Sequence, residues 1–141
     1  MGDALLDALE ALAIGAVAIT ERAIAAAGTD LTFVQWRALL IVGSHEEGAT
    51  VGEIAARIGA HASPASRLVS RLRRRGVIEA TRDSSDRRIT RLTLTSAGRD
   101  LRLRVLEGRR RELAILLADA RFSAQDGATI GRLARQFERI A

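Results

Sequence analysis

The middle of the chain constrains the fold most, because it predicts two short helices joined by a tight turn. Thr50 and Glu53 form a capping-box pattern at the start of the first helix, and Gly59 ends it. Ser63 is predicted to be the N-cap of the second helix, with Pro64 at its first helical position. Two short helices at this spacing predict a helix-turn-helix.

A β-hairpin is predicted directly after the second helix, which ends at Gly76. The runs VIEAT (residues 77–81) and ITRLTLT (residues 89–95) alternate in the manner of short strands. The loop between them, RDSSDRR, is mostly charged and cannot pack in a core. An arginine-bearing hairpin after a helix-turn-helix predicts a wing that contacts something outside the protein.

The second helix of the pair has an apolar side and a basic side. The inward stripe consists of Ala65, Leu68, Val69 and Leu72. The outward face consists of Ser66, Arg67, Ser70, Arg71 and Arg74. Small residues let a helix backbone approach the DNA major groove, and Arg can bond guanine O6 and N7. From the hairpin loop, Arg87 or Arg88 is predicted to enter the adjacent minor groove.

Charge is distributed unevenly along the 141 residues, and all 22 basic residues are Arg. Residues 1–56 hold two Arg and eight acidic residues (net −6), and residues 57–91 hold ten Arg and three acidic residues (net +7). Residues 92–141 hold ten Arg and six acidic residues (net +4). A solvated helix face is the alternative for any one of these arginine runs. The basic centre beside an acidic start, together with the helix-turn-helix spacing, favours binding to a polyanion.

The ends of the chain are predicted to be helical, around a winged helix-turn-helix at residues 30–98. A first helix from about Ala4 to Ala27 is apolar on two sides, and a last helix begins near Ser123. Thr32, with Gln35, starts another helix by a capping box. Excess apolar surface on the first and last helices predicts a homodimer. The expected fold is one mainly α domain over residues 1–141, in which residues 1–29 and 99–141 form a helical dimerisation region.

Three segments, quoted as they stand, resemble the MarR family of winged-helix transcriptional regulators. They are LTFVQWRALL, TVGEIAARIG and ASRLVSRLRRRGVIEATRDSSDRRITRLTLTSAG. The resemblance covers nearly the whole chain. It implies a homodimeric, sequence-specific regulator of double-stranded DNA, a repressor of a near-palindromic operator that a small aromatic ligand releases. The family wing usually reads D-P-R-D-R-R, and DSSDRR here has serine at positions 84 and 85 instead of proline and arginine.

The resemblance also assigns roles to individual residues. It maps Arg88 to the minor groove, and it maps to the recognition helix Ser63, Ala65, Ser66, Arg67, Ser70 and Arg71. Asp86 is expected either to orient a neighbouring Arg or, as a turn residue, to bond its own backbone. His61, in the turn between the helices, is expected to be solvated, to cap, or to reach a phosphate. Phosphate contact or solvation is expected for Arg73, Arg74, Arg75 and Arg82.

Trp36 is expected either to belong to the core or to line a ligand pocket. The resemblance places an effector pocket between the dimer helices and the winged domain. On that basis the candidate pocket residues are Phe33, Trp36 and Arg37.

Several classes of function are disfavoured by what the sequence lacks. There is no Cys, which excludes disulfides and thiolate metal sites, and the two histidines, His45 and His61, are too isolated for a metal site. With no Tyr and no carboxylate pair at a recognisable spacing, neither an enzyme nor a cofactor is expected. The apolar run ALAIGAVAI is about half a membrane span, and a cytoplasmic protein is expected. The remaining alternative is a winged-helix protein-interaction module without a DNA target.

Overall fold

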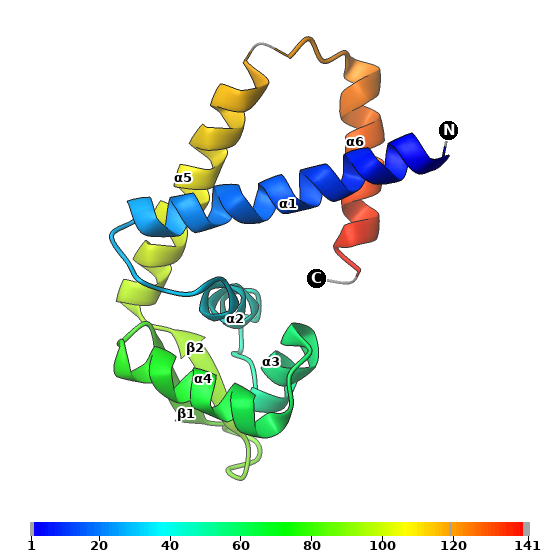
Figure 1. Ribbon diagram of the computed structural model, residues 1–141. Coiled ribbons are helices and arrows are strands. Elements are labelled where there is room, and N and C mark those ends of the chain that lie inside the picture. Colours follow the sequence, from blue (N-terminus) through cyan, green and yellow to red (C-terminus); the bar gives the residue numbers. More distant parts are fainter. Residues whose placement is uncertain (1, 119, 140–141) are drawn as a thin grey trace.

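The computed structural model describes residues 2–118 and 120–139, so the outermost residues of the predicted dimerisation region lie outside the description. In chain order the elements are α1 (Gly2–Ala26), α2 (Phe33–Gly43), α3 (Val51–Ile58), α4 (Ala62–Arg74), β1 (Ile78–Arg82), β2 (Thr90–Leu94), α5 (Ser96–Leu117) and α6 (Ala124–Phe137). The expected mainly α fold with a hairpin wing is confirmed (Figure 1).

Side-chain caps fix where most of these helices begin. Reciprocal capping boxes start α2, α3 and α6, and the residue pairs are Thr32–Gln35, Thr50–Glu53 and Ser123–Asp126. Gly59 ends α3 in the left-handed conformation (φ 68°), which is open to glycine at little cost. The predicted boundaries of α3 therefore hold at both ends.

The start of α4 differs from the prediction by two residues. His61 is the N-cap, without a side-chain capping bond, and Ser63 and Pro64 are the second and third helical residues. Pro64 is tolerated there because the first N–H groups of a helix have no partner within it. Ser63 instead accepts a hydrogen bond from Arg67 Nη1 at 2.9 Å.

The core lies where α2 meets the end of α1, the first half of α5 and the winged part. Its largest fully buried side chains are Trp36, Leu39, Val42, Ile54, Leu72, Leu92 and Val105. Trp36 is 1% exposed, so it is a core residue. In Figure 1, α2 is seen end-on between α1 and the winged part, and α2 therefore joins the two halves of the molecule.

The hairpin is tied to the start of α5. Its strands are antiparallel, with Ile78 opposite Leu94. Thr95 Oγ1 donates to the carbonyl of Gly76 at 2.6 Å and accepts from the N–H of Gly98 at 3.1 Å. Gly98 packs on the backbone of Val77 so closely that a Cβ there would lie 1.9 Å from the Val77 oxygen. A glycine is therefore needed where α5 leaves the wing.

The helices at the two ends carry large apolar side chains that this chain does not cover. None of the described residues of α6 is buried. The exposed apolar side chains on these helices include Leu5, Leu6, Leu12, Ile14, Ile115, Leu116, Ile130 and Phe137. Surface of this kind marks contact with another apolar surface. Among the described residues, no helix combines the length and the apolar character that crossing a membrane takes.

Candidate nucleic-acid interface

The outward face of α4 is exposed along its length. The exposed side chains on it are Ser66, Arg67, Ser70, Arg71, Arg73 and Arg74. The prediction that the Ala65 side chain belongs to the contacting surface is wrong. Ala65 is 0% exposed because it falls on the same buried stripe as Val69 and Leu72.

Among the described residues, the protein's own acids do not neutralise the arginines of α4. Within residues 2–118 and 120–139, no acidic side chain forms an ion pair with Arg67, Arg71, Arg73 or Arg74. Arg75 is different, because it pairs with Asp30 in the linker between α1 and α2. The hydrogen bond from Arg75 lowers the pKa of Asp30 below its ordinary value. The charge of the outward face is therefore available to an external anion.

Asp83 organises the wing loop that joins β1 to β2. Its Oδ1 accepts from the Ser85 hydroxyl at 2.6 Å and from the Ser85 N–H at 2.8 Å, and its Oδ2 accepts from Arg91 Nε at 2.9 Å. These bonds, led by the Ser85 hydroxyl and then Arg91, hold the pKa of Asp83 well below its ordinary value. A lowered pKa in the folded state favours the fold above the ordinary pKa and ceases to do so in strong acid. The loop is therefore fully held at neutral pH.

Sequence reasoning placed Asp83 in the wing pattern but gave it no role, and it missed Arg91. An aspartate two residues before a serine is a signal for an Asx turn, and it could have identified Asp83. No local signal identifies Arg91, since it reaches Asp83 only once the two strands are paired. Ser85 stands where the family pattern has arginine, and here its hydroxyl and N–H help to fix the loop.

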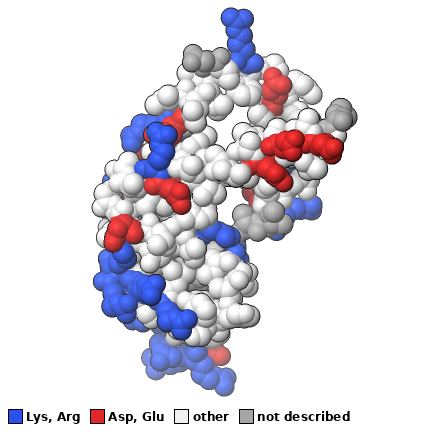
Figure 2. Space-filling model, in the orientation of Figure 1, with Lys and Arg blue, Asp and Glu red and all other residues white. Residues whose placement is uncertain are grey.

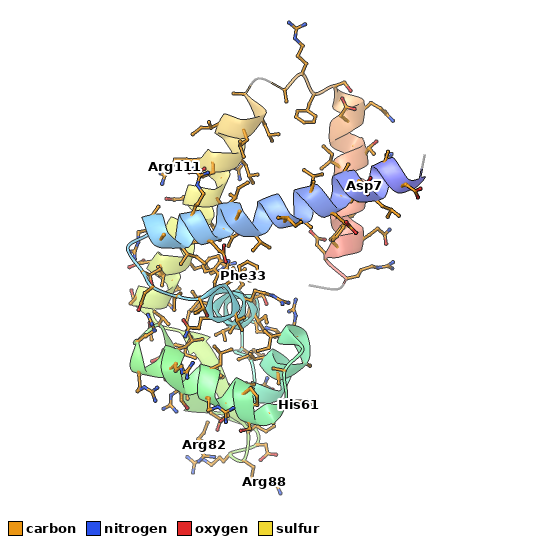
Figure 3. The ribbon with its side chains drawn as sticks, viewed as in Figure 1. Asp7, Phe33, His61, Arg82, Arg88 and Arg111 are labelled. Atoms are coloured by element: carbon orange, nitrogen blue, oxygen red, sulfur yellow. The ribbon has the colours of Figure 1, made fainter. Side chains whose placement is uncertain are left out.

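Arg82 and Arg88 in the wing point away from the body of the protein (Figure 3). Both expectations for Asp86 hold together: its Oδ1 accepts from the Arg88 backbone N–H at 3.0 Å and from Arg88 Nε at 3.3 Å. The Arg88 side chain stays 92% exposed despite this contact. Arg82 Nη1 donates to the carbonyl of Arg87 at 3.0 Å, which braces the loop from β1.

The basic side chains of α4 and the wing gather at one end of the molecule (Figure 2). A groove of about 520 Å³ runs between α4 and β1, and it is lined by Ser70, Arg73, Arg74, Ile78, Glu79 and Ala80. His61 is exposed at the start of α4, on the same end (Figure 3). Asp7 lies at the far end of α1, away from this basic end (Figure 3). The geometry fits one extended polyanion.

A small cavity of about 170 Å³ lies between α1, α2 and α5. It brings together the three predicted pocket residues, Phe33, Trp36 and Arg37. Arg37 Nη2 also donates to the carbonyl of Arg57, in the last turn of α3, at 3.0 Å. Arg109, which sequence reasoning missed, lines the opposite wall. Its buried Nε has no hydrogen-bond acceptor among the residues that the structure describes.

The two histidines lie at different helix ends. His45 Nδ1 contacts the carbonyl of Ile41 at 2.8 Å, and His61 is the N-cap of α4. In the described part of the chain, no three His, Asp or Glu side chains lie close enough together to hold a metal ion.

Comparison with known proteins gives a sequence match and matches to solved structures. A sequence model of the MarR family matches residues 29–89. RV1404 from Mycobacterium tuberculosis is similar over 98% of this chain and 93% of its own, with 28% identity and a TM-score of 0.82. A MarR family protein from Bacillus stearothermophilus is 26% identical over 99% of this chain and 96% of its own, with a TM-score of 0.73. Staphylococcus aureus MarR, in complex with salicylate and kanamycin, is 19% identical over 99% of this chain and 91% of its own, with a TM-score of 0.80. No curated protein matches the sequence.

Proposed function

We propose that this chain, whose residues 29–89 match the MarR family of winged helix-turn-helix transcriptional regulators, represses transcription as a homodimer on a near-palindromic operator. The observation that carries the proposal is the set of exposed arginines on α4 and the wing. Among the described residues, the arginines of α4 form no ion pair with an acidic side chain. Enzymatic chemistry forms no part of the proposal, since MarR family regulators are generally not enzymes.

Each part of the basic end has a proposed role. Ser66 and Ser70 let α4 approach the major groove, where Arg67 and Arg71 bond base edges. Arg88 enters the minor groove, held in orientation by Asp86. Phosphate contacts come from the surrounding side chains, which are His61, Arg74, Arg82 and Arg87. Ser63 contributes by holding the Arg67 side chain.

Duplex binding is expected to be steeply salt-dependent. Each phosphate that an arginine neutralises releases counterions, so 6–10 contacts per dimer lower the affinity roughly 10³- to 10⁵-fold between 50 and 200 mM salt. Fluorescence anisotropy with a labelled duplex of random sequence measures this dependence. A flat dependence, or no binding at 50 mM salt, would favour the protein-interaction module instead.

The partner in the dimer is a second copy of this chain, joined through α1, α5 and α6. The described residues of α6 bury nothing within their own chain, while Ile130 and Phe137 expose about half of their side-chain surface. In the dimer, the two α4 helices are expected to lie about 34 Å apart on one face of the DNA. This distance corresponds to one helical turn of the duplex.

Light scattering after gel filtration is expected to give twice the chain mass of 15.2 kDa at micromolar concentration. The double variant Ile130→Glu and Phe137→Glu should elute as a monomer, because two charges would have to enter an apolar interface. Ala128→Glu lies on the opposite side of α6 and serves as the control that stays dimeric. A monomeric wild-type protein, or a dimeric double variant, would contradict the proposed interface.

The cavity of about 170 Å³ between α1, α2 and α5, called the effector cavity below, is proposed to bind a small aromatic acid. The unpartnered Nε of Arg109 suits a carboxylate, and Phe33 and Trp36 suit a ring. A carboxylate that engages Arg37 competes with the carbonyl of Arg57 for the same guanidinium. Loss of that bond removes one contact between α2 and α3, and α3 leads directly into α4. The ligand then shifts the equilibrium, because it binds the loosened state better.

Salicylate is expected to displace duplex DNA from the wild-type protein. The salicylate concentration that displaces half of the DNA should rise at least about tenfold in Arg37→Met, which keeps the aliphatic stem. The reason is that a charged hydrogen bond contributes about 1.5–3 kcal/mol. Each variant is compared at its own half-saturating protein concentration, and Arg110→Met on the exposed side of α5 is the charge-matched control. Equal release from Arg37→Met and the wild type would rule out this route.

A further inference from the structure

A separate cavity of about 240 Å³ lies at the other end of α2 from the effector cavity. The end of α2, β2 and the first half of α5 enclose it, and its lining includes Gly43, His45, Glu46, Leu94, Arg99 and Arg102. The effector cavity instead uses α2 residues between Phe33 and Leu40. The two cavities therefore do not share a side chain.

Arg102 brings an unused hydrogen-bond donor to this cavity. Its Nε is buried, and no acceptor for it exists among the described residues. The C-terminal end of α2 carries the negative end of the helix dipole, which stabilises the charge of the Arg102 guanidinium nearby. The dipole supplies no acceptor for the Nε N–H. A buried donor of a charged group without a partner is costly, so a ligand atom that accepts from it gains that free energy back.

The packing beside Arg102 depends on residue 43 being glycine. A Cβ on Gly43 would lie 3.2 Å from Arg102 Nε and Cδ, and 2.9 Å from Leu94 Cδ1. Any side chain there would press on the guanidinium and on the apolar side of the cavity. The absence of a side chain at residue 43 therefore keeps the guanidinium and the apolar side of the cavity in place.

Two further groups in the lining have donors or lone pairs to spare. Arg99 is anchored by Nη1, which donates to the Leu94 carbonyl at 2.8 Å. This bond fixes the orientation of the guanidinium, whose other N–H groups can donate to a ligand. His45 Nδ1 must carry its proton, because its 2.8 Å partner, the Ile41 oxygen, can only accept. That tautomer leaves His45 Nε2 for a ligand.

From these contacts we infer that this cavity binds a small organic monocarboxylate, whose carboxylate accepts from Arg102 Nε and Arg99. The planar edge of a guanidinium matches a carboxylate in bidentate fashion. The charged side chains of the lining are Arg99, Arg102 and Glu46, and together they carry one net positive charge. This charge suits a monoanion better than a dianionic phosphate. Val42 and Leu94 provide an apolar side for a short hydrocarbon body. This site goes beyond the proposed regulator function and does not require it.

The test uses the full-length protein and propionate as the probe, followed by amide chemical shifts in two-dimensional NMR. Propionate is expected to shift the amides of Gly43, His45 and Arg102, and neutral propionamide is not. Arg102→Met keeps the packing of the stem and should weaken the binding at least tenfold. Its melting temperature should equal or exceed that of the wild type, since an unpartnered buried N–H is removed.

Two control variants separate this site from the rest of the protein. Arg110→Met should leave the propionate shifts unchanged, and so should Arg109→Met, which alters only the effector cavity. Shifts that persist in Arg102→Met, that arise only around Phe33, or that propionamide reproduces would overturn the inference. Tighter binding of inorganic phosphate than of propionate would overturn the assignment to a monocarboxylate. Failure of duplex binding would leave this result untouched, so the two proposals fail separately.

Discussion

Gly98→Ala is expected to lower the free energy of unfolding by about 3 kcal/mol, at the upper end of the usual cost of overpacking. The new methyl group would lie 1.9 Å from the Val77 oxygen and 2.9 Å from the Val77 carbonyl carbon. Both contacts are with backbone, so no side-chain rotation relieves them. To accommodate the methyl, α5 has to move away from the hairpin and disturb the Thr95 bonds that join the two.

Thermal unfolding at one fixed protein concentration measures this cost, because the melting temperature of a dimer depends on concentration. A loss of about 3 kcal/mol corresponds to roughly 10 °C for a chain of this size. The matched control is Gly52→Ala in α3, where the nearest atom to the added Cβ is Thr50 Oγ1 at 3.8 Å. There we expect no loss and a gain of up to about 1 kcal/mol from helix propensity. Equal stability of Gly98→Ala and the wild type would show that α5 does not pack on the wing in this way.

The double variant Arg71→Ala and Arg88→Ala is expected to weaken binding to a selected operator on the order of 1,000-fold. A dimer loses four proposed base contacts, and each contributes at least about 1 kcal/mol. Both side chains are exposed, and among the described residues Arg88 forms an ion pair only with Asp86, in its own loop. Their removal should therefore leave the fold and the dimer intact.

The matched control for this variant is Arg104→Ala with Arg110→Ala, which removes the same charge from exposed positions of α5. It should weaken binding far less, because these arginines lie away from α4 and the wing. Titrations at one fixed salt concentration compare the two double variants, and circular dichroism checks their folding. Equal losses from both would mean that net charge alone attracts DNA, and unchanged affinity would remove α4 and the wing from the interface.

Local sequence signals were sufficient for most of the fold. The capping pairs at Thr32 and Thr50 and the helix stop at Gly59 act over a few residues, so they can be recognised without the rest of the chain. The start of α4 was predicted two residues late, because Pro64 fits any position of a first turn and Ser63 has a more distant partner in Arg67. The resemblance put Ala65 among the contacting residues by its place on the helix. Its inward spacing with Val69 and Leu72 was the better guide to its burial.

The contacts that join distant parts of the chain were not predictable from local patterns. Arg37 reaches the carbonyl of Arg57 across 20 residues, and Asp30 pairs with Arg75 across 45. The unpartnered nitrogen of Arg109 becomes visible only when α1, α2 and α5 are packed together. Such contacts depend on how helices pack and on which donors the packing leaves unused, and neither has a local sequence signal.

Selection of bound duplexes from a random DNA pool tests most directly whether α4 and the wing form one surface for double-stranded DNA. The expected result is enrichment of a near-palindrome whose half-sites are centred about 10 base pairs apart, one helical turn. The Arg71→Ala and Arg88→Ala variant should enrich nothing from the same pool. A pool without enriched sequences after selection with the wild-type protein, or the same enriched sequences with both proteins, would contradict the proposed interface.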